Sequence, residues 1–572
     1  MESITNPCEV RVHPGASGAL AVCLCAISLG AVGQSAPDAG VLQQQIDRDR
    51  TQQLPRKGIT PKPAEPAALQ PSGASVTVRE FRFAGNTLLT AAQLLPVVAE
   101  FLNRPLDFTQ LQTAAAAIAN AYRDAGWIVR AYLPQQDIKD GLVTIQVVEA
   151  VFGKLSIEGE ATRVAVAGIA QRITSQLATA TPLNGDALDR ALLLVDDLPG
   201  VTVAGTLRAG ERDGETDLQL KIADEPLVIG EISADNAGSR STGKQRLNAN
   251  LVLASPLGFG DQLTSSLIHS EGSDYLRIAY SLPIGMDGWR IGANVSNLDY
   301  RLVSPDFTAL NAHGNSTTGG LEASYPIVRS RLKNLYLNLA LDHRAFDNIS
   351  SNATTSRYAI DSASIALAGN LFDSLGGGGA NSANVSFVQG RVDLDGSPNR
   401  NADAATTRTH GAYRKLRYGV TRQQVVTQDI SLFAQYSGQL ANKNLDSSEK
   451  FFLGGSSGVR AYPTSEGGGS NAQMLNLELR TRLPAGFTAA TFQDWGRISQ
   501  NVDNNFTGAP NANSYSLRGH GLNLAWQADF GLNLKATWAR RQGSNPNPTT
   551  TGKDQDGSLY NNRLWLSASM LF

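Results

Sequence analysis

Residues Leu335 to Asp342 read LYLNLALD, in which every second residue is leucine and the others are Tyr, Asn, Ala and Asp. Successive side chains of a β-strand point to opposite faces, so this stretch predicts a strand with one apolar and one wet face. The same alternation recurs in Leu475–Arg480 (LNLELR) and in Leu532–Trp538 (LNLKATW). Strands of about 9–11 such residues cross a bilayer when they are tilted.

A soluble β-sandwich would alternate in the same way, with its apolar face turned to a core. Two observations favour a membrane barrel. The β pattern runs without an obvious break over 227–572, which is long for one sandwich, and the polar face holds charges that suit an aqueous lumen: Glu478, Arg480, Arg482 and Lys535. About sixteen segments fit a barrel with an even number of strands, eleven before a glycine-rich loop and five after it. We therefore predict a 16-stranded antiparallel transmembrane β-barrel over 226–572.

Composition narrows the function. The 572 residues include 49 basic and 51 acidic side chains, for a net charge of −2. This balance gives no reason to expect nucleic acid binding, which needs a concentrated basic face. After the N-terminal region no apolar run reaches the ~18 residues of a membrane helix, so the chain is either soluble or crosses the membrane as a closed barrel.

The N-terminal region predicts a signal peptide over 1–33. A short apolar core (GALAVCLCAISLGAVG, 18–33) follows Arg11 and His13 and ends in small residues; the alternative is a buried helix. All three cysteines precede residue 26, so the mature chain would hold no thiol to mispair in an oxidising compartment. A polar, Gln-rich helix is predicted within 34–54, either disordered or in a polar cavity, and a Pro-rich linker over 55–75.

The next 150 residues predict two α+β modules of the same order. In 76–150, a strand, two helices and two strands follow one another, and 151–225 repeats this βααββ order. Neither module shows a nucleotide loop or a catalytic set. Such modules bind polypeptide by adding a strand to an open sheet edge, or they act as spacers.

One loop in the β region differs from the rest. Phe451–Pro463 reads FFLGGSSGVRAYP, with a single cation, Arg460, among apolar and glycine residues. A carboxylate that could pair with it follows in TFQDWGRI, where Asp494 shares a strand face with Phe492 and Gly496. Taken alone, the stretch could also be a surface loop with a solvated arginine.

Together these features resemble the two-partner secretion transporters, the haemolysin-activator and filamentous-haemagglutinin-exporter family of the Omp85 superfamily. The likeness covers nearly all of the mature chain. Local motifs agree with it: YLPQ (132–135), DGL (140–142), LPG (198–200) and DNAG (235–238). The family motif Val-Arg-Gly-Tyr stands here as Val459-Arg460-Ala461-Tyr462, with alanine for glycine, and Phe-x-Asp-x-Gly is matched by Phe492, Asp494 and Gly496.

The resemblance implies the roles of these parts. The modules would be POTRA domains in the periplasm, residues 34–54 a removable plug, and 451–472 an inward-folded loop whose Arg460 pairs with Asp494. The terminal Phe572 would be the signal read by the barrel-assembly machinery. The implied function is export of a large secreted partner across the outer membrane of a Gram-negative bacterium, without ATP. No catalytic residue, cofactor or metal is predicted.

Three other functions are weighed against this one. An Omp85-type assembly factor shares the loop arginine, but usually has more POTRA domains and no plug. A passive porin leaves 76–225 unexplained. An enzyme is disfavoured because the six histidines are scattered through the sequence.

Overall fold

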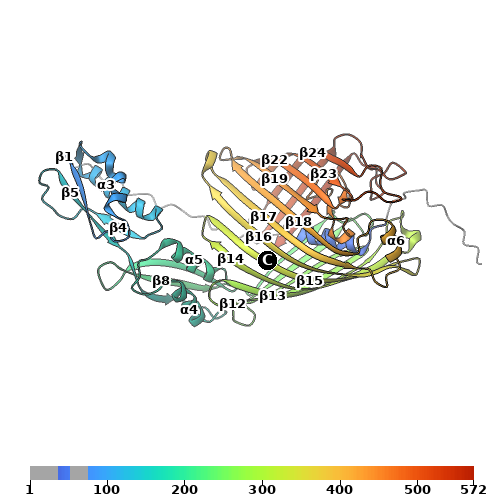
Figure 1. Cartoon of the computed structure of the whole chain (residues 1–572), viewed down its shortest axis with the longest axis horizontal. Helices are drawn as coiled ribbons and strands as arrows, with labels where there is room; N and C mark the ends of the chain where they lie inside the picture. The colour runs from blue at the N-terminus through green and yellow to red at the C-terminus, as the bar shows by residue number, and fades with distance from the viewer. Residues whose placement is uncertain (1–35, 52–74) are drawn as a thin grey trace, which may run out of the picture.

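The computed structural model describes residues 36–51 and 75–572, and these form a barrel with two small modules at one end (Figure 1). The predicted signal peptide lies outside the described residues, as does the predicted linker except for Ser75. Of the helices that the structure describes, none is both long and apolar enough to span a membrane.

The first module packs helices against a small mixed sheet. Its elements are β1 (Ser75–Thr77), β2 (Glu80–Ala84), α2 (Ala91–Leu94), η1 (Leu95–Phe101), β3 (Pro105–Asp107), α3 (Phe108–Asp124), β4 (Val129–Tyr132) and β5 (Leu142–Glu149). The sheet order is β2-β5-β4, with β2 and β5 parallel. The single first strand predicted from the sequence is split, because the backbone N–H groups of Arg79 and Glu80 turn to donate to Gly141 O. Among the described residues, no further strand pairs with the outer edge of β2 or of β4.

The second module repeats the βααββ order. It comprises β6 (Val151–Glu158), α4 (Val166–Gln176), α5 (Gly185–Asp196), β7 (Val201–Ala209) and β8 (Glu215–Asp224), in the sheet order β6-β8-β7. Asn184 caps α5 by accepting the Ala187 N–H. The two modules join through backbone hydrogen bonds, such as Ile128 N to Leu183 O at 3.1 Å and Gly185 N to Gly126 O at 2.8 Å.

The predicted 16-stranded barrel is confirmed. Its strands are β9 (Val228–Asp235), β10 (Arg246–Ala254), β11 (Gln262–Ser270), β12 (Ser273–Ile284), β13 (Trp289–Arg301), β14 (His313–Arg329), β15 (Lys333–Ser350), β16 (Ala353–Asp373), β17 (Gly379–Asp393), β18 (Gly411–Val425), β19 (Ile430–Ala441), β22 (Asn471–Arg482), β23 (Phe487–Ser499), β24 (Ser514–Gln527), β25 (Leu532–Arg541) and β26 (Asn562–Leu571). Neighbours are antiparallel, and β26 pairs with β9 to close the ring.

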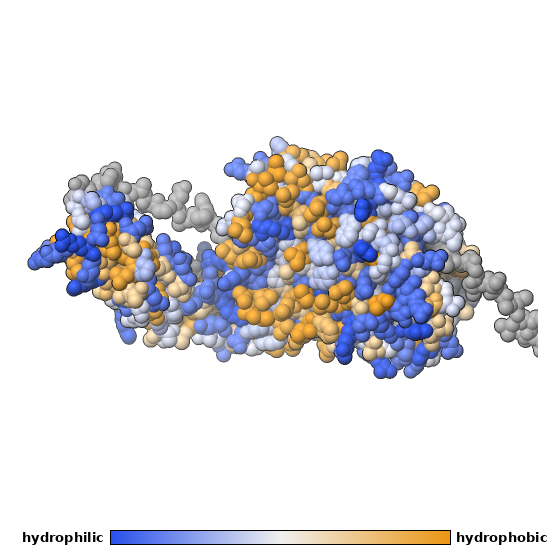
Figure 2. Space-filling view, turned by 45° about the horizontal axis from the view of Figure 1, so that its top comes forward, coloured by the Kyte–Doolittle hydropathy of each residue, from blue (hydrophilic) through white to orange (hydrophobic). Residues whose placement is uncertain are grey.

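The barrel wall has the predicted two faces. Leu341 on β15 and Leu522 on β24 point outward, 57 % and 58 % exposed. Figure 2 shows hydrophobic residues gathered on the wall, while the end with the long loops is mainly hydrophilic. An apolar exterior around a polar interior is what a barrel in lipid requires.

The second module is fixed to the barrel rim at the end with the short turns. Arg329 of β14 donates to both carboxylate oxygens of Asp197, each at 2.7 Å, and Arg331 pairs with Asp189 at 3.0 Å. Ser255 Oγ, in the β10–β11 turn, donates to Arg163 O at 2.9 Å. This rim is therefore the side that the resemblance assigns to the periplasm, and the long connections lie at the opposite, outer rim.

Helix α1 (Ala39–Thr51) lies inside the barrel (Figure 1). Its Ala39, Leu42 and Ile46 are buried in one cluster with wall residues that include Tyr275 and Phe346. Three apolar residues at helical spacing thus help to seat a mostly polar helix in the lumen.

Candidate functional site

The sixth outer connection, residues 442–470 and here called loop 6, folds back toward the lumen. It contains η4 (Ser447–Glu449) and a short hairpin of β20 (Phe451–Phe452) with β21 (Gly468–Gly469). Its tip is too tightly folded for side chains at two glycines: a Cβ on Gly454 would lie 2.0 Å from Pro463 O, and one on Gly458 2.0 Å from Leu453 O. The glycines therefore allow two backbone segments of the loop to pack closely together, and this fold places Arg460 against the barrel wall.

Arg460 and Asp494 form a buried, two-pronged ion pair. Arg460 Nε donates to Asp494 Oδ2 at 2.9 Å and Nη2 to Oδ1 at 2.7 Å, and the Arg460 backbone N–H also reaches Oδ2 at 3.0 Å. Arg460 is 5 % exposed and Asp494 is fully buried. Burial acts against the charged guanidinium, but the hydrogen bonds and charge of Asp494 raise the pKa of Arg460 above its ordinary value.

Glu478 is a second carboxylate partner that the sequence analysis did not assign. Arg460 Nη1 donates to Glu478 Oε1 at 2.5 Å. Strand β22 pairs with β23 so that Glu478 lies opposite Phe492, and the Arg460 guanidinium carbon stands 3.5 Å above the Phe492 ring centre. The alternation of β22 had placed Glu478 on the lumen face, but only the register between the strands shows which loop residue it meets. We call Arg460, Asp494 and Glu478 the clasp.

Two further polar groups hold the clasp in place. Asn476 Nδ2 donates to Asp494 Oδ1 at 2.8 Å and to Gly458 O at 3.0 Å. From the last strand, Trp565 Nε1 donates to Arg460 O at 2.8 Å. With these bonds, both Asp494 oxygens accept hydrogen bonds, and Nε, Nη1 and Nη2 of Arg460 each donate one. A buried ion pair is favourable when its polar atoms are satisfied in this way.

The other motif residues surround the clasp. Val459, Ala461 and Tyr462 are buried, with Tyr462 under the Arg541 guanidinium at 4.7 Å. Gly496 leaves room for the Leu453 side chain, which lies 2.7 Å from where a Cβ would be. Phe572, predicted as an assembly signal, lies at the β26–β9 closure, where it exchanges backbone hydrogen bonds with Gly230.

The alanine that replaces the motif glycine is accommodated. Ala461 is not among the residues with positive φ. Its Cβ lies 2.6 Å from where Gly519 of β24 would carry a Cβ. This close contact therefore requires glycine at position 519 of the wall, and it leaves room for the alanine methyl group at position 461 of the loop.

Helix α1 contacts loop 6 directly. Arg48 donates from Nη1 to Phe452 O at 2.7 Å and from Nη2 to Gly454 O at 2.8 Å. At the start of the helix, Ser447 of loop 6 donates to Asp38 at 2.9 Å. The helix and the loop therefore share an interface in the lumen.

Two lumen arginines also bind the helix, and each has a second carboxylate. Arg246 pairs with Asp49 of α1 at 2.7 Å and with Asp235 of its own wall at 2.9 Å. Arg344 reaches Asp47 of α1 at 3.6 Å and Glu449 of loop 6 at 3.2 Å.

One group of possible metal ligands occurs among the described residues, formed by Asp393, Asp395 and His410. His410 Nδ1 accepts the Leu394 N–H at 3.1 Å, which in the neutral ring leaves the proton on Nε2. The nitrogen that faces Asp395 therefore has no free lone pair, and both carboxylates are exposed. We assign no metal to this group.

The fold and the clasp define an outer-membrane transport barrel with periplasmic modules, and comparison with known proteins identifies its family. Residues 214–523 match the model of the haemolysin secretion/activation proteins ShlB/FhaC/HecB, and 76–150 match the ShlB-type POTRA domain. The chain belongs to this family.

Individual relatives agree. The chain is 24 % identical over 466 residues to the heme/hemopexin transporter protein HuxB of Haemophilus influenzae, covering 78 % of this chain and 80 % of that one. It is 26 % identical over 446 residues to the outer membrane transporter CdiB of Dickeya dadantii, covering 76 % and 77 %. The solved structure of CdiB from Escherichia coli superposes with a TM-score of 0.67 at 21 % identity, over 95 % of this chain and all of that one.

The protein is therefore an outer-membrane transporter of a two-partner secretion system, with its POTRA domains in the periplasm. The family match favours this function over the alternative of an Omp85-type assembly factor.

Proposed function

We propose that this transporter exports one large partner protein in an unfolded state through its own barrel, after α1 has left the lumen and loop 6 has rearranged. The observation that carries this proposal is the position of α1, which is seated by ion pairs and three apolar side chains rather than by a continuous core. A helix held in this way fills the pore at rest and can be displaced.

The POTRA domains receive the partner in this proposal. Among the described residues, β2 and β4 of the first module and β7 of the second pair with a strand on one side only, and such an edge can accept an added strand from an extended polypeptide. Because the second module is fixed to the rim through Asp197 and Asp189, a chain bound there is held next to the lumen. The periplasm supplies no nucleotide, so direction comes from folding of the partner outside, which removes the unfolded form.

Deleting the transporter from its host tests this function. One large protein should disappear from the culture medium and return when the intact chain is supplied. An unchanged set of secreted proteins would refute the export function.

Deleting residues 38–54 should raise the conductance of single channels in a planar bilayer. The deletion removes the helix that fills the lumen, whereas the clasp keeps all its partners on loop 6, β22 and β23. The matched control is Asp49→Asn with Asp47→Asn, which weakens the ion pairs to Arg246 and Arg344 but retains the helix. We expect brief openings from the control and a steady open level from the deletion; equal conductance of the deletion and the intact chain would contradict the plug.

A further inference from the structure

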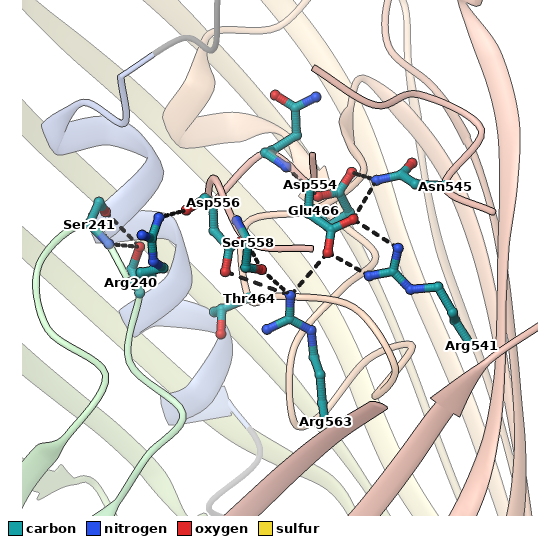
Figure 3. Close-up of polar contacts among 12 residues, drawn as sticks. Arg240, Ser241, Thr464, Glu466, Arg541, Asn545, Asp554, Asp556, Ser558 and Arg563 are labelled. Atoms are coloured by element: carbon teal, nitrogen blue, oxygen red, sulfur yellow. Dashed lines mark hydrogen bonds and ion pairs between the residues drawn. The ribbon is translucent and has the colours of Figure 1, made fainter. Parts of the chain in front are cut away.

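A second polar cluster joins loop 6 to the last outer connection, residues 542–561, here called loop 8 (Figure 3). Glu466 stands on the arm of loop 6 that returns from the clasp, and Asp554 stands in loop 8. Both carboxylates are fully buried. Neither belongs to the motifs singled out in the sequence.

One amide joins the two carboxylates. Asn545 Nδ2 donates to Glu466 Oε1 at 2.9 Å and to Asp554 Oδ1 at 2.9 Å. The Gln555 backbone N–H donates to the other oxygen, Glu466 Oε2, at 2.8 Å. Loop 6 is thus bound to loop 8 through both oxygens of Glu466.

Asp554 fixes loop 8 to the strands at its two ends. Arg541, at the end of β25, donates to Asp554 Oδ1 at 3.0 Å and also binds Oδ2. Arg563, at the start of β26, donates to Asp554 Oδ2 at 3.1 Å. Arg541 stacks on Tyr462 of the loop 6 motif as well, so the cluster also contacts the motif that carries Arg460.

The same arm of loop 6 reaches across the closure between the last and first strands. Thr464 Oγ1 donates to Ala237 O at 2.9 Å, in the β9–β10 connection. Arg240 of that connection donates to Asp556 O of loop 8 at 2.8 Å (Figure 3). Loops 1, 6 and 8 therefore meet at one place on the outer side, where loop 1 is residues 236–245.

We propose that Glu466, Asn545 and Asp554 form a second clasp, which ties loop 6 to loop 8 at the outer mouth of the barrel and has to open before the partner protein can leave. Glu466 positions loop 6 against loop 8, and loop 6 has to lose the hydrogen bonds of Glu466 to Asn545 and Gln555 before it can move. This inference rests on the proposed function, since it supposes that loop 6 moves during export.

The two carboxylates of the cluster differ in their ion pairing. Asp554 binds both arginines, whereas no ion pair joins Glu466 to a cation among the residues that the structure describes. The titratable and charged groups that face Glu466 are Asp554 and Asp556 of loop 8, Tyr515 of β24, Tyr462 of its own loop, and Arg541 and Arg563 at the strand ends. Burial, with the charges of Asp554 and Asp556, outweighs the hydrogen bonds from Asn545 and Gln555, which favour the ionised form, and raises the pKa of Glu466 to about 7.

The raised pKa sets the direction of a pH effect. With the second clasp closed, Glu466 keeps its proton up to near neutral pH, whereas after release into water it ionises near its ordinary pKa. The closed form thus binds more protons between these values, so closure weakens as pH rises. A shift from 4.5 to about 7 predicts a rise of about tenfold in the open fraction between pH 6 and pH 8.

Hydrogen exchange on the full-length protein in lipid nanodiscs tests this inference at the Gln555 N–H, which Glu466 accepts. Protection factors, corrected for the intrinsic exchange rate, should fall about tenfold from pH 6 to pH 8 in the intact chain. Glu466→Gln cannot ionise, and its single amide oxygen can accept the Gln555 N–H although its NH2 group cannot accept from Asn545. Its protection should therefore be independent of pH. Asp395→Asn, an exposed carboxylate on another outer loop, should behave as the intact chain does.

Two results would overturn the second clasp: equal pH dependence in Glu466→Gln and the intact chain, or no pH dependence in the intact chain. Asp554→Asn removes the carboxylate that binds Arg541 and one of the two that bind Arg563, and it should lower protection at both pH values. If that variant does not assemble, Glu466→Gln decides alone. Secretion of the partner, measured in the same strains, distinguishes failure of the second clasp from failure of the proposed function. Normal export by the intact chain with a failed exchange test removes the second clasp and leaves the proposed function standing.

Discussion

Arg460→Ala should give a barrel that assembles in the outer membrane but secretes almost no partner protein. The substitution leaves Asp494 fully buried with no cation and removes one of the partners of Glu478. Removing one member of a buried ion pair costs about 3–5 kcal/mol, which is more than about a hundredfold in the fraction of correctly seated loop. The partner protein in the culture medium, measured by immunoblot against cell-associated protein, checks this result.

Two variants control for charge and for folding. Arg460→Lys retains the cation but loses the fork that binds both Asp494 oxygens, so we expect intermediate secretion. Arg482→Ala removes an exposed arginine of β22 and should secrete normally. Barrel assembly is followed by the heat-dependent shift in gel migration. Normal export by Arg460→Ala would exclude a role for the clasp.

A disulfide between α1 and loop 6 should stop secretion almost completely until it is reduced. A Cβ on Gly40 would lie 2.5 Å from Ser447 Oγ, so Gly40→Cys with Ser447→Cys brings two thiols within bonding reach. The covalent bond prevents the helix from leaving, whatever the free energy of its ion pairs. Secretion is measured before and after dithiothreitol.

The single-cysteine variants are the matched controls, because each has the steric change without the bond. The cysteines of the natural sequence, at 8, 23 and 25, all precede the described residues. Full secretion by a chain shown to be cross-linked would mean that the partner passes with α1 in place, and the plug would then be wrong.

The sequence predicted the fold closely because period-two alternation reports directly on a wall between lipid and water. Leu335–Leu341 and Leu475–Leu479 show their apolar face in the sequence itself, and strand order follows once all neighbours are antiparallel. The two βααββ modules were equally visible from helix spacing and capping, as at Asn184.

The site was predicted only in part. Arg460 and Asp494 were found because a lone cation in an apolar loop needs a partner, and a motif supplied one. Glu478, Trp565 and Glu466 were not assigned, because their contacts depend on strand register and on where long loops fold. Residues far apart in sequence meet there, and a one-residue change of register would exchange lumen and lipid faces.

Arg246 and Arg344 each bind one carboxylate of the helix and a second carboxylate outside it, Asp235 of the wall or Glu449 of loop 6. When the helix leaves while loop 6 is still in place, each arginine therefore retains one carboxylate, and neither cation is left unpaired in the lumen. In the proposed plug mechanism, the helix can return to the lumen after each passage and pair again with the same two arginines.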